Sequence, residues 1–233
     1  MKPSVTILLD QAQKKMSGYA ALLNYRFINL SVKALPEALL SVVVSAEGES
    51  MPIEQAALAR HAAGKDDRFE IYPKNRSLLG PVVAGLKLAH PEYKLELKDI
   101  SGSEDAEGVK DQYVLATVPE VDDARHNQLK EAVETLSGRC DDLLKLVQSD
   151  YSDRIHQDLD GASPAETEEA DEALKNLYDK HDKLCKQFRS EKEKEIEQAY
   201  EKYKQKNQKA SANGPGASAN AGKQMRMTSG YDD

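Results

Sequence analysis

Three stretches of the chain carry apolar residues at alternating spacings of three and four, which is the pattern of a helix that buries one stripe. They cover residues 5–30, residues 120–160, and a segment from residue 163 to about residue 206. In the first stretch the apolar positions are Leu9, Ala12, Met16, Tyr19, Leu23, Phe27 and Leu30. These three stripes can bury only against one another, so the sequence predicts a long three-helix bundle built from both ends of the chain.

A strong helix-start signal separates the second stripe from the third, in the segment DGASPAE. The Ser163 side chain can accept a hydrogen bond from the backbone N–H three residues on, and Glu166 can reach back to complete a capping box. Pro164 suits the first helical position because it has no N–H to satisfy. We therefore expect a turn at this point, followed by a long final helix whose Glu and Lys residues, three and four apart, support an exposed end.

Residues 32–117 show the shorter alternation that is typical of strands. LLSVVVSAEG, DRFEIYP, YKLELKD and QYVLATVP are expected as strands, SLLGPVVAGLKLAH as a short helix, and DISGSEDAEGVKD as a polar loop. The predicted fold class is α+β: a bundle domain at 1–31 and 118–206, and a small α/β domain at 32–117 inserted after the first helix. Residues 207–233, rich in Gly, Ala, Ser and Asn, are expected to form a disordered tail.

The composition restricts the partners that the protein can have. The chain of 233 residues is 39% apolar and 31% charged, with a net charge of −8, so a nucleic acid could be bound only by a local basic patch. Cys140 and Cys185 both lie in helical patterns and are expected to be reduced core thiols. No apolar run is long enough for a membrane span, and the N-terminal segment matches neither a secretory signal nor an Arg-rich transit peptide.

No motif for bond-making chemistry was found. The sequence contains no phosphate-binding loop, nucleophile elbow or zinc-protease motif. The histidines do not have metal-ligand spacing, and His181, on the bundle seam, is expected to be a hydrogen-bonded core or boundary residue. They are His61, His90, His126, His156 and His181. We therefore expect a protein that acts by shape and binding, with no enzymatic activity, cofactor or metal.

Six segments, in chain order, carry a resemblance to a known family: VKALPEALLSVVV, GESMPIEQAA, RFEIYPKNRSLL, VPEVDDARHNQL, LLKLVQSDYSDRIHQDL and SPAETEEADEALKNLYDKHDKLCKQ. They are similar in order and spacing to segments of the ribosome recycling factor family. Pro52, Ile53 and Gln55, for example, match the family's Gly-Thr-Pro-x-Pro-Leu-x-Gln loop. The resemblance covers roughly residues 5–204 and implies an L-shaped molecule.

The resemblance also implies a function in protein biosynthesis. The protein would bind the post-termination ribosome through large-subunit rRNA, as a monomer, and would promote subunit separation with a translocase GTPase of the elongation factor G type. A mitochondrial location is expected, with the cytoplasm as the alternative. Two other functions stay open: a ribosome-associated assembly or structural protein that has lost recycling activity, and a coiled-coil adaptor unrelated to ribosomes.

The chain departs from the family pattern at positions where family members have arginines that contact rRNA. The matching positions here are Lys33, Asp141, Lys145, Gln148 and Ser149. Lysine keeps the charge but lacks the planar fork that grips a phosphate with two bonds. Residues 120–160 contain five basic residues against eleven acidic ones.

We take Lys33 and Lys145 as candidate rRNA contacts because the resemblance places them. Arg26 and Arg139 are added for their positions near the hinge and on the second helix. The alternative is that all four are solvated surface charges.

Overall fold

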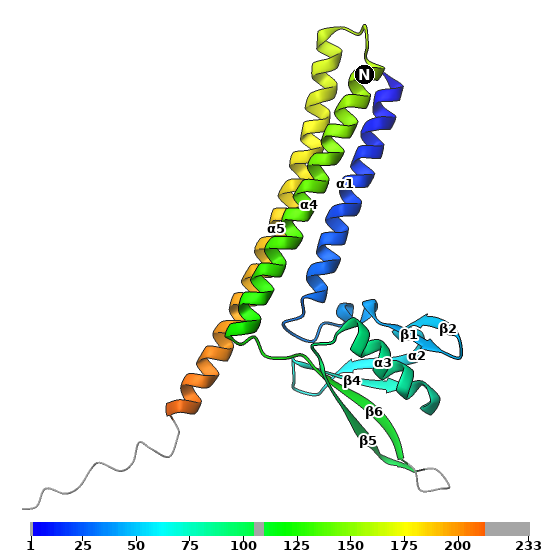
Figure 1. Ribbon diagram of the computed structural model, residues 1–233, viewed down its shortest axis with the longest axis vertical. Helices are drawn as coiled ribbons and strands as arrows, with labels where there is room; N and C mark the ends of the chain where they lie inside the picture. The colour runs from blue at the N-terminus through cyan, green and yellow to red at the C-terminus, as the bar shows by residue number, and fades with distance from the viewer. Residues whose placement is uncertain (1, 105–109, 213–233) are drawn as a thin grey trace, which may run out of the picture.

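The computed structural model describes residues 2–104 and 110–212, the side chains of 103, 104 and 210–212 excepted. It contains a long three-helix rod and a small domain attached beside one end of the rod (Figure 1). The rod consists of α1 (Pro3–Asn29), α4 (Asp123–Asp158) and α5 (Pro164–Ala212). The small domain follows α1 and precedes α4, which confirms the predicted α+β fold with a bundle and an inserted domain.

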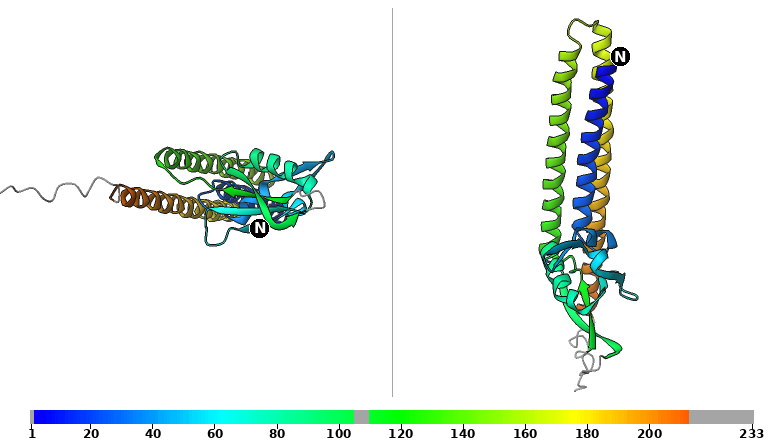
Figure 2. Two further views of the ribbon diagram at one scale, coloured as in Figure 1. Left: turned by 90° about the horizontal axis from the view of Figure 1, so that it is seen from below. Right: turned by 90° about the vertical axis from the view of Figure 1, so that its right-hand side faces the viewer.

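Each helix of the bundle packs against the other two, and the three run along one another in Figure 1 and in the right-hand view of Figure 2. The predicted stripe of α1 is the one that is buried: Ala12 and Met16 are fully inaccessible and Phe27 is nearly so. Tyr151 on α4 and Ile196 on α5 lie in the same core. A long aliphatic or aromatic side chain buried in this way contributes roughly 1.5–3 kcal/mol, so the core makes the rod stiff.

The ends of the helices are capped as the sequence indicates. Asp122 Oδ1 accepts a hydrogen bond from the Arg125 backbone N–H at 2.8 Å and so starts α4. At the start of α5, Ser163 Oγ accepts from the Glu166 N–H at 3.4 Å, and Glu166 Oε2 accepts from the Ser163 N–H at 3.2 Å. The predicted capping box is therefore confirmed, and it explains the sharp turn between α4 and α5.

Helix α5 continues to Ala212, so the boundary predicted between residues 206 and 207 is wrong. The reason is that NQKASA contains no helix breaker, and the first Gly-Pro pair follows only at residues 214–215. Residues 213–233 of the predicted disordered tail lie outside the described part of the chain.

The small domain has a four-stranded antiparallel sheet of order β3-β4-β6-β5, a separate hairpin β1-β2, and the helix α3. The bounds are β1 (Val43–Ala46), β2 (Glu49–Pro52), α2 (Ile53–Ala56), β3 (Ala57–His61), β4 (Arg68–Pro73), α3 (Leu79–Ala89), β5 (Lys94–Glu104) and β6 (Lys110–Thr117), with 3-10 turns at Pro36–Ser41 and Arg76–Leu78. Phe69, Ile71, Val114 and Leu86 form the centre of its core.

Two sequence expectations in this domain are corrected. The start of LLSVVVSAEG forms a 3-10 turn, because Pro36 opens it and Ala38 and Leu39 turn inward, and the strand begins only at Val43. In the polar segment expected as a loop, residues 99–104 belong to β5 and residues 110–111 belong to β6, and Glu104 pairs with Lys110 after a register shift. Strand pairing satisfies the backbone N–H and C=O groups there, which outweighs the low strand preference of the residues. Residues 105–109 of that segment lie outside the described part of the chain.

Candidate nucleic-acid interface

The hinge between the domains consists of two chain crossings, each tied to the loop between β3 and β4. The Ala34 N–H donates to the Asp66 carbonyl and the Val118 N–H donates to the Asp67 carbonyl, both at 2.8 Å. Residues 30–35 and 118–122 therefore leave the bundle next to each other. Ala34 and Val118 belong to the core of the small domain and Val121 belongs to the core of the bundle, so the two cores meet within these short segments. The joint between the two domains is therefore the part of the molecule at which a bend would occur.

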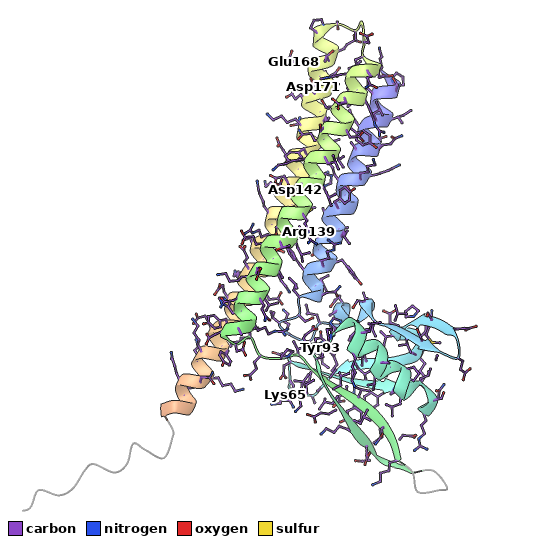
Figure 3. All side chains as sticks on the ribbon, in the orientation of Figure 1. Lys65, Tyr93, Arg139, Asp142, Glu168 and Asp171 are labelled. Carbon is purple, nitrogen blue, oxygen red and sulfur yellow. The ribbon has the colours of Figure 1, made fainter. Side chains whose placement is uncertain are left out.

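A buried hydrogen-bond network fastens the small domain to the bundle at this hinge. The Tyr93 hydroxyl donates to Ser31 Oγ at 2.8 Å, and the Arg125 guanidinium donates to the Ser31 carbonyl at 2.7 Å. Burial raises the pKa of Tyr93 to about 12 and lowers that of Arg125. Figure 3 shows Tyr93 where the small domain meets the lower end of the rod. Sequence reasoning missed these contacts, since they join residues far apart in the chain.

Lys33, the candidate from the first crossing, is half-exposed and turned toward α5. Its Nζ lies 3.5 Å from Glu195 Oε1, and Glu195 Oε2 accepts a hydrogen bond from the buried Lys192 at 2.8 Å. Burial lowers the pKa of Lys192, while the Glu195 carboxylate opposes that effect. One carboxylate is therefore shared by two lysines, so the charge of Lys33 is partly neutralised within the protein.

Lys33 also borders a depression of about 400 Å³ between the small domain and α5. Lys65 from the β3–β4 loop and Lys202 from α5 line it, together with Lys206, which is paired with Glu120. Lys65 can be followed in Figure 3, on the side of the small domain that is turned to α5. The depression combines acidic and basic groups, so it does not form a purely cationic surface.

Lys145, the candidate on α4, is exposed and forms an ion pair within its own helix. Its Nζ lies 2.6 Å from Asp141 Oδ2, four residues earlier, and the Asp141 hydrogen bond raises the pKa of Lys145. Tyr178 from α5 donates to the other oxygen of Asp141 at 3.1 Å. Lys145 thus lies over the groove between α4 and α5, away from the hinge.

Arg26 and Arg139 are exposed, and neither has an ion pair among residues 2–104 and 110–212. Arg26 lies in the last turn of α1, while Arg139 lies near the middle of α4 (Figure 3). The four candidates are therefore spread over the hinge, the α1 end, the middle of α4 and the α4–α5 groove. Within the described residues they do not form one compact basic patch.

Acidic groups on the bundle have basic partners on the same helix or on a neighbouring one, which reduces the local negative field. Asp150 lies between Arg154 at 3.1 Å and Lys15 of α1 at 4.0 Å. Glu197 accepts from His126 at 2.9 Å, and this hydrogen bond, followed by that of Lys130, lowers the pKa of Glu197. Exposed ion pairs of this kind contribute little to stability, but they determine which surface charges remain unneutralised toward a binding partner.

Two further features concern groups that could carry catalysis or bind a metal. His181 is buried as expected, but the expectation of a hydrogen-bonded side chain is wrong, because neither ring nitrogen has a partner in the described structure. Burial lowers the pKa of His181, with Lys180 adding to the effect. Among the described residues, no three His, Cys, Asp or Glu side chains are placed to share a metal ion, and no helix is long and apolar enough to cross a bilayer.

Comparison with known proteins gives a similarity in structure alone. No protein-family model matches the chain, and no curated protein matches it in sequence. A solution structure of ribosome recycling factor matches with a TM-score of 0.66 and 16% identity, covering 85% of this chain and 100% of the other. A T. thermophilus ribosome recycling factor, placed with E. coli elongation factor G on the E. coli post-termination complex, matches with a TM-score of 0.53 and 17% identity, covering 82% and 98%. The chain therefore has the fold of ribosome recycling factor.

Proposed function

We propose that this protein binds the post-termination ribosome and, with a translocase GTPase of the elongation factor G type, promotes separation of the subunits. The observation that carries the proposal is the fold match, which extends over the full length of a solved ribosome recycling factor. A second matching factor is placed with elongation factor G on a post-termination complex, which supports the same two partners here.

The mechanics of the molecule suit this role. The bundle has a continuous core along α1, α4 and α5, so it can transmit a push without bending. The small domain is joined to it by two crossings and a few hydrogen bonds, so it can rotate as a unit. A partner that hydrolyses GTP would supply the energy, and this chain would act as the lever.

A second function is favoured by the charges. Lys33 and Lys145 are both held by carboxylates of the protein, and α4 with its flanking residues has more than twice as many acidic as basic side chains. Phosphate contacts depend on unneutralised Lys and Arg, so this surface favours weak rRNA binding. The alternative is a ribosome-associated assembly or structural protein that keeps the fold without recycling activity.

A subunit-splitting assay distinguishes the two functions. Post-termination complexes are mixed with the full chain, the GTPase and GTP, and the subunits are separated by sedimentation. A recycling factor yields free subunits with GTP and few with GDP. Stable binding to ribosomes without splitting under any nucleotide would support the assembly function and reject recycling.

A second experiment tests the proposed phosphate contacts. Co-sedimentation at several salt concentrations is measured for Lys33→Glu and Lys145→Glu, with Lys14→Glu, an exposed α1 lysine, as the matched control. Each lost phosphate contact lowers the slope of log affinity against log salt by about one. Equal slopes for all variants and the wild type would exclude Lys33 and Lys145 as contacts. The same experiment on Arg26→Glu and Arg139→Glu tests the two arginines.

The compartment and the oligomeric state belong to the proposal as well. We propose a mitochondrial protein, with the cytoplasm as the alternative, acting as a monomer. Fractionation of cells followed by detection of the endogenous chain tests the compartment. Light scattering of the purified protein tests the monomer, and a mass of twice 25.8 kDa would reject it.

A further inference from the structure

Two cysteines face each other in the middle of the rod. Cys140 is halfway along α4, and its Sγ lies 3.5 Å from the Sγ of Cys185 on α5. Both thiols are free and buried. Cys140 also donates a weak hydrogen bond to the Tyr19 carbonyl of α1 at 3.7 Å, so this pair lies at a point where all three helices meet.

A groove gives small reagents access to one thiol of the pair. It has a volume of about 310 Å³ and lies between α4 and α5, with Cys185 among its lining residues. Lys145, Lys186 and Arg189 lie around it. The volume is several times that of a water molecule, about 30 Å³ in the liquid, so a peroxide can enter as far as Cys185, whose Sγ lies 3.5 Å from that of Cys140.

The two thiols have unequal acidity, which suits an attacking and a resolving sulfur. The hydrogen bond from Cys185 lowers the pKa of Cys140, and the charge of Arg26 lowers it further, against the effects of burial and Asp141. The pKa of Cys185 is raised by the same hydrogen bond and by its burial. Cys140 is therefore the more acidic thiol of the two, which assigns it the attacking role and Cys185 the resolving role.

We propose that Cys140 and Cys185 are an oxidation site at which a peroxide converts the thiol pair into an intramolecular disulfide that fastens α4 to α5. The Cys140 thiolate attacks one oxygen of hydrogen peroxide, the O–O bond breaks, and the second oxygen leaves as hydroxide and takes up the thiol proton as water. Cys185 Sγ then attacks the sulfenic sulfur, so the S–S bond forms while the S–O bond breaks. The departing hydroxyl takes the Cys185 proton, so two thiols and one peroxide give one disulfide and two waters.

Closing the bond requires only a small movement. The sulfurs must approach from 3.5 Å to about 2.05 Å, a change of about 1.5 Å. The two cysteines are 45 positions apart, so the bond closes a long loop in the unfolded chain, and we expect the melting temperature to rise by about 5–10 °C. This inference does not depend on the proposed function, because it concerns only the bundle.

The test uses the reduced full chain. It is treated with a small excess of hydrogen peroxide at low protein concentration, quenched, and analysed by intact mass and peptide mapping. The expected result is a mass loss of about 2 Da, a linked peptide pair containing positions 140 and 185, and reversal by dithiothreitol. Free thiols after treatment, disulfide-linked dimers, or oxidation that stops on one sulfur of the wild type would each overturn the proposal.

Single variants check the assignment of roles. Cys185→Ser removes the resolving sulfur, so Cys140 should be trapped as a sulfenic acid by a dimedone-type reagent. Cys140→Ser should react at least tenfold more slowly with peroxide than Cys185→Ser. Equal or reversed rates would overturn Cys140 as the attacking sulfur. The mass of the wild type tests the disulfide even if a variant fails to fold.

Discussion

Glycine to alanine substitutions should have opposite effects at two helical positions of this protein. Gly85 lies inside α3 where the helix crosses β1, and a Cβ built there would be 2.5 Å from the Val43 carbonyl oxygen and 3.3 Å from Val42 Cγ1. Gly18 lies inside α1, and a Cβ at that position would have no heavy atom within 4 Å. Both glycines therefore lower the helix propensity, but only Gly85 permits a close approach of backbones.

The magnitudes follow from these distances. Alanine at Gly18 removes the conformational cost of glycine in a helix and should stabilise the bundle by about 0.5–1 kcal/mol. At Gly85 the same gain is available, but α3 must move away from a carbonyl oxygen that belongs to a strand. Overpacking of this kind costs about 1–3 kcal/mol, so Gly85→Ala should destabilise the small domain by a net amount of about 1–2 kcal/mol.

Hydrogen exchange resolved by segment is the suitable assay, because it measures the two domains separately. In Gly85→Ala, amides of α3, β1 and the sheet should exchange about tenfold faster, with the bundle unchanged. In Gly18→Ala the bundle should exchange about two- to fivefold more slowly. If Gly85→Ala protects the small domain as Gly18→Ala protects the rod, the close packing of α3 on β1 is refuted.

The other predictions concern buried or paired polar groups. Tyr93→Phe should cost about 1 kcal/mol, because it leaves the buried Ser31 hydroxyl without its donor, and denaturant unfolding of the two proteins measures this. Since the pKa of Tyr93 is raised to about 12, its contribution to stability should hold below pH 10 and decline between pH 10 and 12. Over that range the melting temperature of the wild type should fall by more than that of Tyr93→Phe. The hydrogen bond with His126 lowers the pKa of Glu197. The wild type should therefore be more stable than Glu197→Gln at pH 6, and this difference should vanish as the pH falls through the lowered pKa. A difference that persists in acid would reject the pair. His181→Leu removes two unpaired buried nitrogens and should raise stability by about 1 kcal/mol, whereas a loss would indicate a hydrogen bond to water in solution.

The bundle could be predicted from the sequence because the residues that indicate each helix lie close to one another in the chain. The stripe of α1 repeats over seven turns, so each of Leu9, Met16 and Phe27 independently indicates the buried face. The capping box at Ser163 and Glu166 is likewise set by residues three apart. Signals of this kind do not require knowledge of which distant segment lies opposite.

The hinge and the candidate site could not be predicted in the same way. Ser31 and Tyr93 are 62 positions apart, and no spacing rule joins them. The ion pair of Lys33 with Glu195 depends on how α5 passes the hinge, so the sequence indicated either an rRNA contact or a solvated charge at Lys33, and it gave no sign of the carboxylate partner. Strands β2 and β3 were missed because ESMP and ALARH lack the β-branched residues that usually mark a strand.

The unequal lengths of α4 and α5 restrict how the joint can turn. Helix α5 has 49 residues and α4 has 36, so α5 extends past the hinge by about 20 Å at 1.5 Å per residue (Figure 1). Its Lys202 and Tyr203 face the β3–β4 loop across the depression at the hinge. A rotation of the small domain toward α5 would therefore be arrested once that gap had closed. The part of α5 beyond the start of α4 thus sets a limit to movement of the small domain in that direction.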